Sequence, residues 1–71
     1  MSVYILFHNS SEAIRASRVL KKSGIEHKLV SVPRHLSSDC GYCVSLDEKD
    51  IDGTLGLFTQ QAVPYDRVVK A

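Results

Sequence analysis

The order of strand-like and helix-like segments constrains this chain more than any other feature of its sequence. Runs of β-branched and aromatic residues indicate strands, and apolar residues at helical spacing indicate helices. The predicted elements are a strand over 3–7, a helix over 13–23, strands over 27–32 and 43–46, a helix over 47–61 and a strand over 65–69. This order is that of the split βαβ motif. We therefore predict one α+β, ferredoxin-like (βαββαβ) domain over residues 1–71, with two helices on one face of a four-stranded antiparallel sheet.

The first helix has the clearest local signals. Asn9 or Ser10 can accept hydrogen bonds from its first-turn amides, and Gly24 can end it in the left-handed conformation. Small or apolar residues at helical spacing are predicted to face the core: Ala13, Ala16, Leu20 and either Ile14 or Ser17. Cations are predicted on the outer face: Arg15, Arg18, Lys21 and Lys22. In the second helix, Asp47 is the expected N-cap.

Size and charge exclude several classes of function. A chain of 71 residues buries too little surface to enclose a deep substrate cavity as well as a core. Nine Lys and Arg against eight Asp and Glu give a net charge of +1, so we expect neither nucleic acid nor a membrane surface as a partner. Apolar runs are too short to span a bilayer, and the start of the chain lacks a secretory signal. A cytoplasmic protein is the expectation.

Two cysteines, Cys40 and Cys43, are the most informative residues for function. One pair is too few for a secreted domain stapled by disulfides, whereas a close pair in a reducing compartment indicates reactive or metal-binding thiols. Cys40 lies in the polar connection predicted between the second and third strands. Cys43 begins the third strand and can equally be a buried, unreactive position.

The residues around Cys40 suggest how its thiol could be activated. The thiolate is the nucleophilic form of cysteine, and Arg34 would favour it while Asp39 would oppose it. Gly41 would let the backbone approach a bound group closely, and the Ser38 hydroxyl can donate a hydrogen bond. The candidate site comprises two thiols and three activating or binding residues: Cys40, Cys43, Arg34, Ser38 and Gly41.

Several kinds of chemistry fit this Cys-Gly-Tyr-Cys segment. A thiol–disulfide couple has the right spacing, but a thioredoxin-like motif precedes a helix and this pair does not. A closed metal site needs about four ligands, and the chain has no second cysteine pair, so no metal and no other cofactor is expected. A group carrier needs only one accessible thiolate, with Cys43 available to resolve the adduct as a disulfide. An interaction domain with incidental cysteines is the remaining alternative.

A resemblance to a known family bears on this choice. An apolar strand, a Ser-Glu-Ala helix, Lys-Lys-Ser-Gly-Ile at 21–25 and Val-Pro-Arg-x-Leu-Ser-Ser-x-Cys-Gly at 32–41 resemble the small bacterial selenium/sulfur carrier family. The resemblance implies a carrier rather than a true enzyme, holding a persulfide or perselenide on Cys40. It also implies protein donors and acceptors, such as cysteine desulfurase-like or selenophosphate-synthesis enzymes. Cys43 departs from the family pattern, which keeps the redox and metal alternatives open. The family motif falls here on Pro33, Arg34, Ser37, Ser38, Cys40 and Gly41.

The predicted fold also has a consequence for association. With both helices on one face of the sheet, the other face is open in a monomer, and the apolar strand over 3–7 would expose part of its surface there. Exposed apolar patches often mark association surfaces. We therefore expect a homodimer, or a partner protein, to cover the open sheet face.

Overall fold

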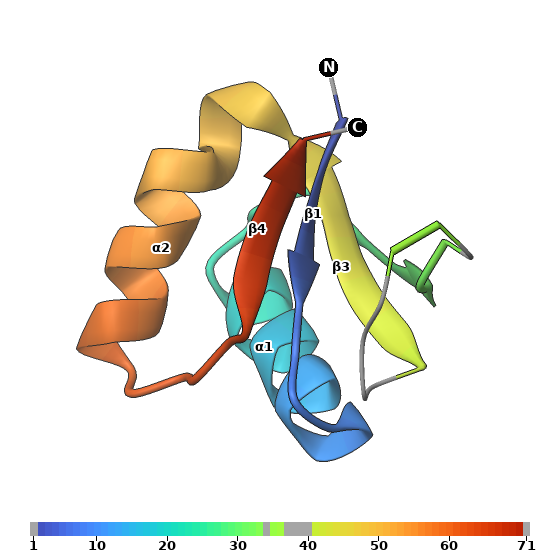
Figure 1. Ribbon diagram of the computed structural model, residues 1–71. Helices are drawn as coiled ribbons and strands as arrows, with labels where there is room; N and C mark the ends of the chain where they lie inside the picture. Colours follow the sequence, from blue (N-terminus) through green and yellow to red (C-terminus); the bar gives the residue numbers. More distant parts are fainter. Residues whose placement is uncertain (1, 34, 37–40, 71) are drawn as a thin grey trace.

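The computed structural model describes residues 2–33, 35–36 and 41–70 and has the predicted order of elements (Figure 1). The strands are β1 (Ser2–Leu6), β2 (Lys28–Ser31), β3 (Tyr42–Asp47) and β4 (Arg67–Lys70). The helices are α1 (Ser10–Lys22), a short 3-10 helix η1 (Glu48–Asp50) and α2 (Ile51–Gln60).

The four strands form one antiparallel sheet in the order β2-β3-β1-β4. Ile5 of β1 lies opposite Val44 of β3 on one side and Val68 of β4 on the other. The two apolar strands β1 and β3 are therefore central, and the two shorter strands lie at the edges. Helix α1 passes behind the strands in Figure 1. This is the ferredoxin-like arrangement, and the predicted fold class is confirmed.

Side-chain caps fix the start of α1. The Asn9 side chain accepts a hydrogen bond of 2.9 Å from the Glu12 amide, so the N-cap is Asn9 rather than Ser10. The helix therefore begins at Ser10, three residues before the predicted start. Its inward face contains Ala13, Ala16 and Leu20 as predicted, and of the two remaining candidates Ser17 is half-buried while Ile14 is exposed.

A Schellman motif ends α1. Gly24 has a φ of 74°, its amide bonds to the Lys21 carbonyl at 3.2 Å, and the Ile25 amide bonds to the Leu20 carbonyl at 3.0 Å. These bonds satisfy two of the helix's terminal carbonyls, and the positive φ explains why glycine occupies this position.

The second helical segment differs from the prediction at its start. The Asp47 side chain does act as a cap, but its Oδ1 accepts from the Lys49 amide two residues on, at 3.1 Å, and this closes the 3-10 helix η1. Helix α2 begins only at Ile51. Short 3-10 turns are common at helix starts, so the predicted segment 47–61 begins with η1 rather than with a regular α-helical turn.

The hydrophobic core lies between the sheet and both helices. The Phe58 ring of α2 packs against Phe7 at 6.3 Å and Tyr65 at 6.2 Å between ring centroids. Arg15 of α1 donates from Nη2 to the Gln61 carbonyl at 3.1 Å, which links the end of α2 to α1. The buried members of this core are Ile5, Phe7, Ala13, Ala16, Leu20, Val44, Leu46, Phe58 and Val63.

Candidate functional site

The connection between β2 and β3 contains most of the predicted site residues. The Val32 amide donates to the Gly41 carbonyl at 3.0 Å, so the segments that follow β2 and precede β3 remain paired one residue beyond the Ser31–Tyr42 pair. Within the connection, the Leu36 amide donates to the Pro33 carbonyl at 2.9 Å. Arg34, Ser38 and Cys40 lie outside the described residues, so their predicted roles stay predictions.

Gly41 stands at the end of this connection and is exposed. A Cβ atom added there would meet nothing within 4 Å among the described parts of the chain. The backbone φ of Gly41 also lies outside the positive region; among the described glycines, Gly24 is the one with a positive φ. Neither the backbone conformation nor internal packing therefore requires glycine here, which leaves the predicted close approach to a bound group as a hypothesis.

Cys43 lies in β3, on the sheet face that the helices do not cover. Its neighbours Val44 and Leu46 alternate with it along the strand, and Val44 packs in the core under the helices. Although no helix covers its face, the Cys43 side chain is 0% exposed, as is Leu6 directly opposite it in β1. The structure therefore places Cys43 in a buried position, the kind in which cysteines are usually inert.

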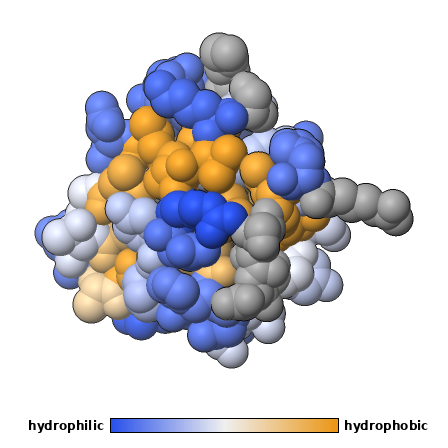
Figure 2. Space-filling view, viewed as in Figure 1, coloured by the Kyte–Doolittle hydropathy of each residue, from blue (hydrophilic) through white to orange (hydrophobic). Residues whose placement is uncertain are grey.

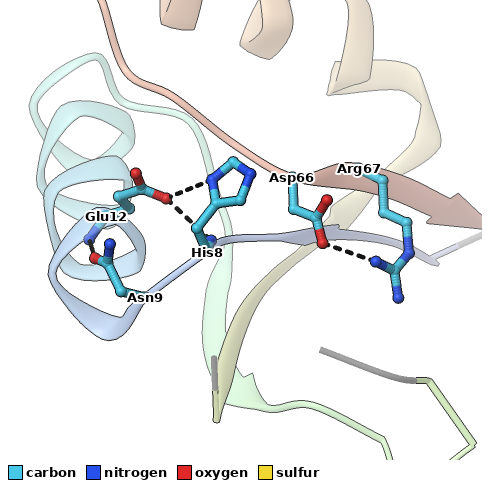
Figure 3. Close-up of polar contacts among 5 residues, drawn as sticks. All are labelled: His8, Asn9, Glu12, Asp66 and Arg67. Atoms are coloured by element: carbon cyan, nitrogen blue, oxygen red, sulfur yellow. Dashed lines mark hydrogen bonds and ion pairs between the residues drawn. The ribbon is translucent and has the colours of Figure 1, made fainter. Parts of the chain in front are cut away.

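A row of side chains crosses this helix-free face through Cys43. The strand registers align Arg67 of β4, Leu6 of β1, Cys43 of β3 and Val30 of β2. Arg67 is two strands from Cys43, about 10 Å across the sheet between backbones. Its Nη1 donates to Asp66 Oδ2 at 2.7 Å (Figure 3).

Arg67 is thus a cation on the same sheet face as Cys43 that the sequence analysis missed. Alternation within 65–69 could have assigned Arg67 to a face, but only the strand register shows that it shares a row with Cys43.

Hydrophobic atoms gather over the centre of this face (Figure 2). Tyr4, Val30 and Val69 are half-buried there, and Leu6 and Cys43 are sealed beneath the surface. The apolar area available to a partner is therefore smaller than the apolar sequence of β1 suggests. Hydrophilic atoms also interrupt the patch in this view.

Two of the three histidines, His8 and His27, are bonded to other parts of the fold, whereas the exposed His35 lies in the β2–β3 connection itself. The backbone amide and the Nδ1 atom of His8 both lie 3.0 Å from Glu12 Oε1, which ties His8 to the start of α1 (Figure 3). His27 bonds through Nε2 to Ser17 Oγ at 2.8 Å and through Nδ1 to the Ile25 carbonyl at 2.9 Å. Among the described residues, no group of three His, Cys, Asp or Glu side chains is placed to hold a metal ion.

The perturbed ionisable groups of the described chain lie at the other end of β3. Lys70 Nζ contacts Glu48 Oε1 at 2.9 Å, and this hydrogen bond with its charge attraction lowers the pKa of Glu48 and raises the pKa of Lys70. The hydrogen bond from the Lys49 amide lowers the pKa of Asp47. The Glu48–Lys70 ion pair ties η1 to β4, and both interactions lie at the end of β3 opposite Tyr42.

A shallow groove of about 570 Å³ is found near that end as well, between the 24–28 segment, the end of β3 and η1. Both positive and negative side chains line it, including Lys28, Lys49 and Asp50. Cys43 and Gly41 are not among its lining residues.

Comparison with known proteins identifies the family of the chain. No described helix is long and apolar enough to cross a membrane. Searches of curated proteins and of solved structures find no match. Residues 2–70 match the model of the family described as "Putative Se/S carrier protein-like", which covers nearly the whole chain and both cysteines. The chain therefore belongs to this Se/S carrier protein-like family.

Proposed function

We propose that this protein carries sulfur or selenium as a persulfide or perselenide on Cys40 and delivers it to a partner enzyme. The observation that carries the proposal is the family match over residues 2–70. The sequence supports it too, because Cys40 directly precedes Gly41, whose carbonyl accepts the Val32 amide beyond the last pair of β2 and β3. The partners are a protein donor, such as a cysteine desulfurase-like enzyme, and an acceptor such as a selenophosphate-synthesis enzyme.

The loading step is a transfer without net oxidation. The Cys40 thiolate attacks the terminal sulfur of a persulfide on the donor, and a new S–S bond forms as the donor's own S–S bond breaks. The donor cysteine leaves as a thiolate with the bonding electrons. Arg34 would favour the Cys40 anion, and Ser38 and Gly41 would shape the segment around it.

Delivery can follow two routes that differ in the part played by Cys43. An acceptor nucleophile can attack the terminal sulfur and regenerate the Cys40 thiolate. Alternatively, Cys43 can attack the Cys40 sulfur, forming a disulfide and releasing hydrosulfide, after which a cellular thiol must reduce the disulfide. The complete burial of Cys43 favours the first route, because the second requires its sulfur to leave the sheet face.

Mass spectrometry after incubation with a cysteine desulfurase and cysteine tests this function. We expect a mass increase of one sulfur atom, located on Cys40, that a thiol reductant removes. Cys40→Ser should abolish this adduct, and Cys43→Ser, the matched control, should retain it. If the wild-type protein stays unmodified while a known acceptor is loaded in parallel, the carrier function is wrong.

The same samples separate the alternatives. A Cys40–Cys43 disulfide that forms without any sulfur adduct would indicate a redox couple. Stoichiometric zinc or iron that is lost on replacing either cysteine would indicate a metal site. Full cellular activity of the double serine variant would indicate an interaction domain.

A further inference from the structure

The outer edge of β2 presents backbone groups that have no hydrogen-bond partner in the described part of the chain. β2 is at the end of the sheet and pairs with β3 alone. The bond from the Val32 amide to the Gly41 carbonyl fixes which residues face β3, because in an antiparallel pair every second residue points toward the neighbouring strand. Lys28 and Val30 therefore face β3, and the N–H and C=O groups of Leu29 and Ser31 point outward.

No hydrogen bond to these four outward groups is found within residues 2–33, 35–36 and 41–70. An edge strand with free backbone groups is a template for pairing with another chain unless charges, prolines or bulges block it. β4, the other edge strand, has ion pairs at both ends, from Arg67 to Asp66 and from Lys70 to Glu48. In β2 the only charged residue is Lys28.

An apolar side chain of this edge strand is also exposed. Leu29 is 40% exposed and, like Val44 opposite it, lies on the helix side of the sheet. A groove of about 430 Å³ runs beside β2 and has Ser17, Lys21 and Leu29 among its lining residues. The edge of β2 thus combines free hydrogen-bonding groups with unburied hydrocarbon.

We propose that β2 pairs with β2 of a second copy of this chain, antiparallel and about a two-fold axis at Val30. In this register Leu29 lies opposite Ser31 of the partner subunit. Each of these pairs exchanges both of its N–H to C=O hydrogen bonds, so the two symmetry-related pairs make four bonds. The two sheets join into one of eight strands.

A second copy fits this edge because the edge is complementary to itself. The outward groups of Leu29 and Ser31 are placed symmetrically about Val30, which is what a two-fold axis requires. Lys28 lies opposite Val32 of the partner subunit, so the two Lys28 residues stand about 13 Å apart along the strands and do not clash. The exposed Leu29 side chains of the two copies are diagonal neighbours across the axis and can pack together.

This interface differs from one formed by the helix-free sheet face. Edge pairing leaves that face open and extends it, since Val30 of each copy meets Val30 of the other on that side. A protein partner that adds an extended segment to β2 would use the same backbone groups. The test must therefore separate three occupants of the surface: a second copy at the edge, a second copy on the face, and a different chain.

Ser31→Pro is the sharpest variant. The Ser31 amide points away from β3, so proline removes an intermolecular donor without removing a bond of the intrachain ladder. Ser31→Thr is the matched control, because it keeps the donor. Analytical ultracentrifugation of the wild-type protein and the Thr variant should show a concentration-dependent dimer. The Pro variant should have an association constant lower by about tenfold or more, because two of the four bonds are lost.

Amide hydrogen exchange of the wild-type protein provides a second test that needs no variant. We expect the Leu29 and Ser31 amides to become protected as protein concentration rises, while the Val30 amide is protected at every concentration. A chain that stays monomeric at millimolar concentration would overturn the proposal. So would a dimer that Ser31→Pro leaves intact, or protection of Leu29 and Ser31 that appears only when another protein is added.

Discussion

Thr54 in α2 is a polar residue whose replacement should stabilise the fold. Its side chain is 0% exposed, and its Oγ1 has no hydrogen-bond partner among the described residues. A hydroxyl that loses water without gaining a partner costs about 1–3 kcal/mol. Valine has nearly the same shape, is also β-branched and has a similar helix propensity, so Thr54→Val removes this cost with little loss elsewhere.

We expect Thr54→Val to raise the free energy of unfolding by about 1–2 kcal/mol. For a domain of this size each kcal/mol corresponds to about 4–8 °C in the midpoint of thermal unfolding. Urea and thermal denaturation followed by circular dichroism would measure both quantities.

The same helix provides the control. Thr59 is exposed, and its Oγ1 donates to the Leu55 carbonyl at 3.1 Å, so Thr59→Val should change the free energy of unfolding by no more than about 0.5 kcal/mol. If Thr54→Val leaves the stability unchanged or lowers it, the hydroxyl is satisfied in solution and the reasoning from its burial fails.

Three further predictions concern the site, an ion pair and a cap. Gly41→Ala should keep the stability of the wild type within about 0.5 kcal/mol in urea denaturation, because a Cβ there meets no described atom within 4 Å, while reducing sulfur loading on Cys40 if a bound group approaches the backbone. Lys70 lowers the folded-state pKa of Glu48, so their ion pair stabilises the fold above the usual glutamate pKa, and this stabilisation is lost as the pH falls through the lowered value. In acid, the thermal midpoint of the wild type should therefore converge on that of Glu48→Gln. A difference between the two midpoints that stays constant with pH would contradict this. Gly24→Ala should lower the free energy of unfolding by about 1–2 kcal/mol, since its φ of 74° disfavours a Cβ, and an unchanged urea midpoint would argue against the Schellman geometry.

The fold could be predicted from the sequence because its signals are local. Asn9 and Gly24 mark the ends of α1 within a few residues, and the apolar character of β1 marks a central strand whatever its partners. The sequence did not reveal the 3-10 helix η1, because an N-cap such as Asp47 can begin either a 3-10 turn or an α-helix.

The candidate site was less accessible to such reasoning. The burial of Cys43 depends on which side chains lie across from it, and the register with Leu6 and Val30 is a long-range property of the sheet. The same holds for Arg67, whose face and row follow from the pairing of β4 with β1. For Cys40, the sequence identified the residue type and its neighbours, and these remain the basis of the proposed chemistry.

The hydrogen bond between Val32 and Gly41 has a consequence for how such a protein can diversify. It holds Val32 and Gly41 together at the sheet margin, so lengthening the stretch between them adds the entropic cost of closing a longer loop. This entropy grows slowly, by about 0.6 kcal/mol for each doubling of length. Insertions between these two anchors are therefore inexpensive, and this connection can change in length while the sheet stays unaltered.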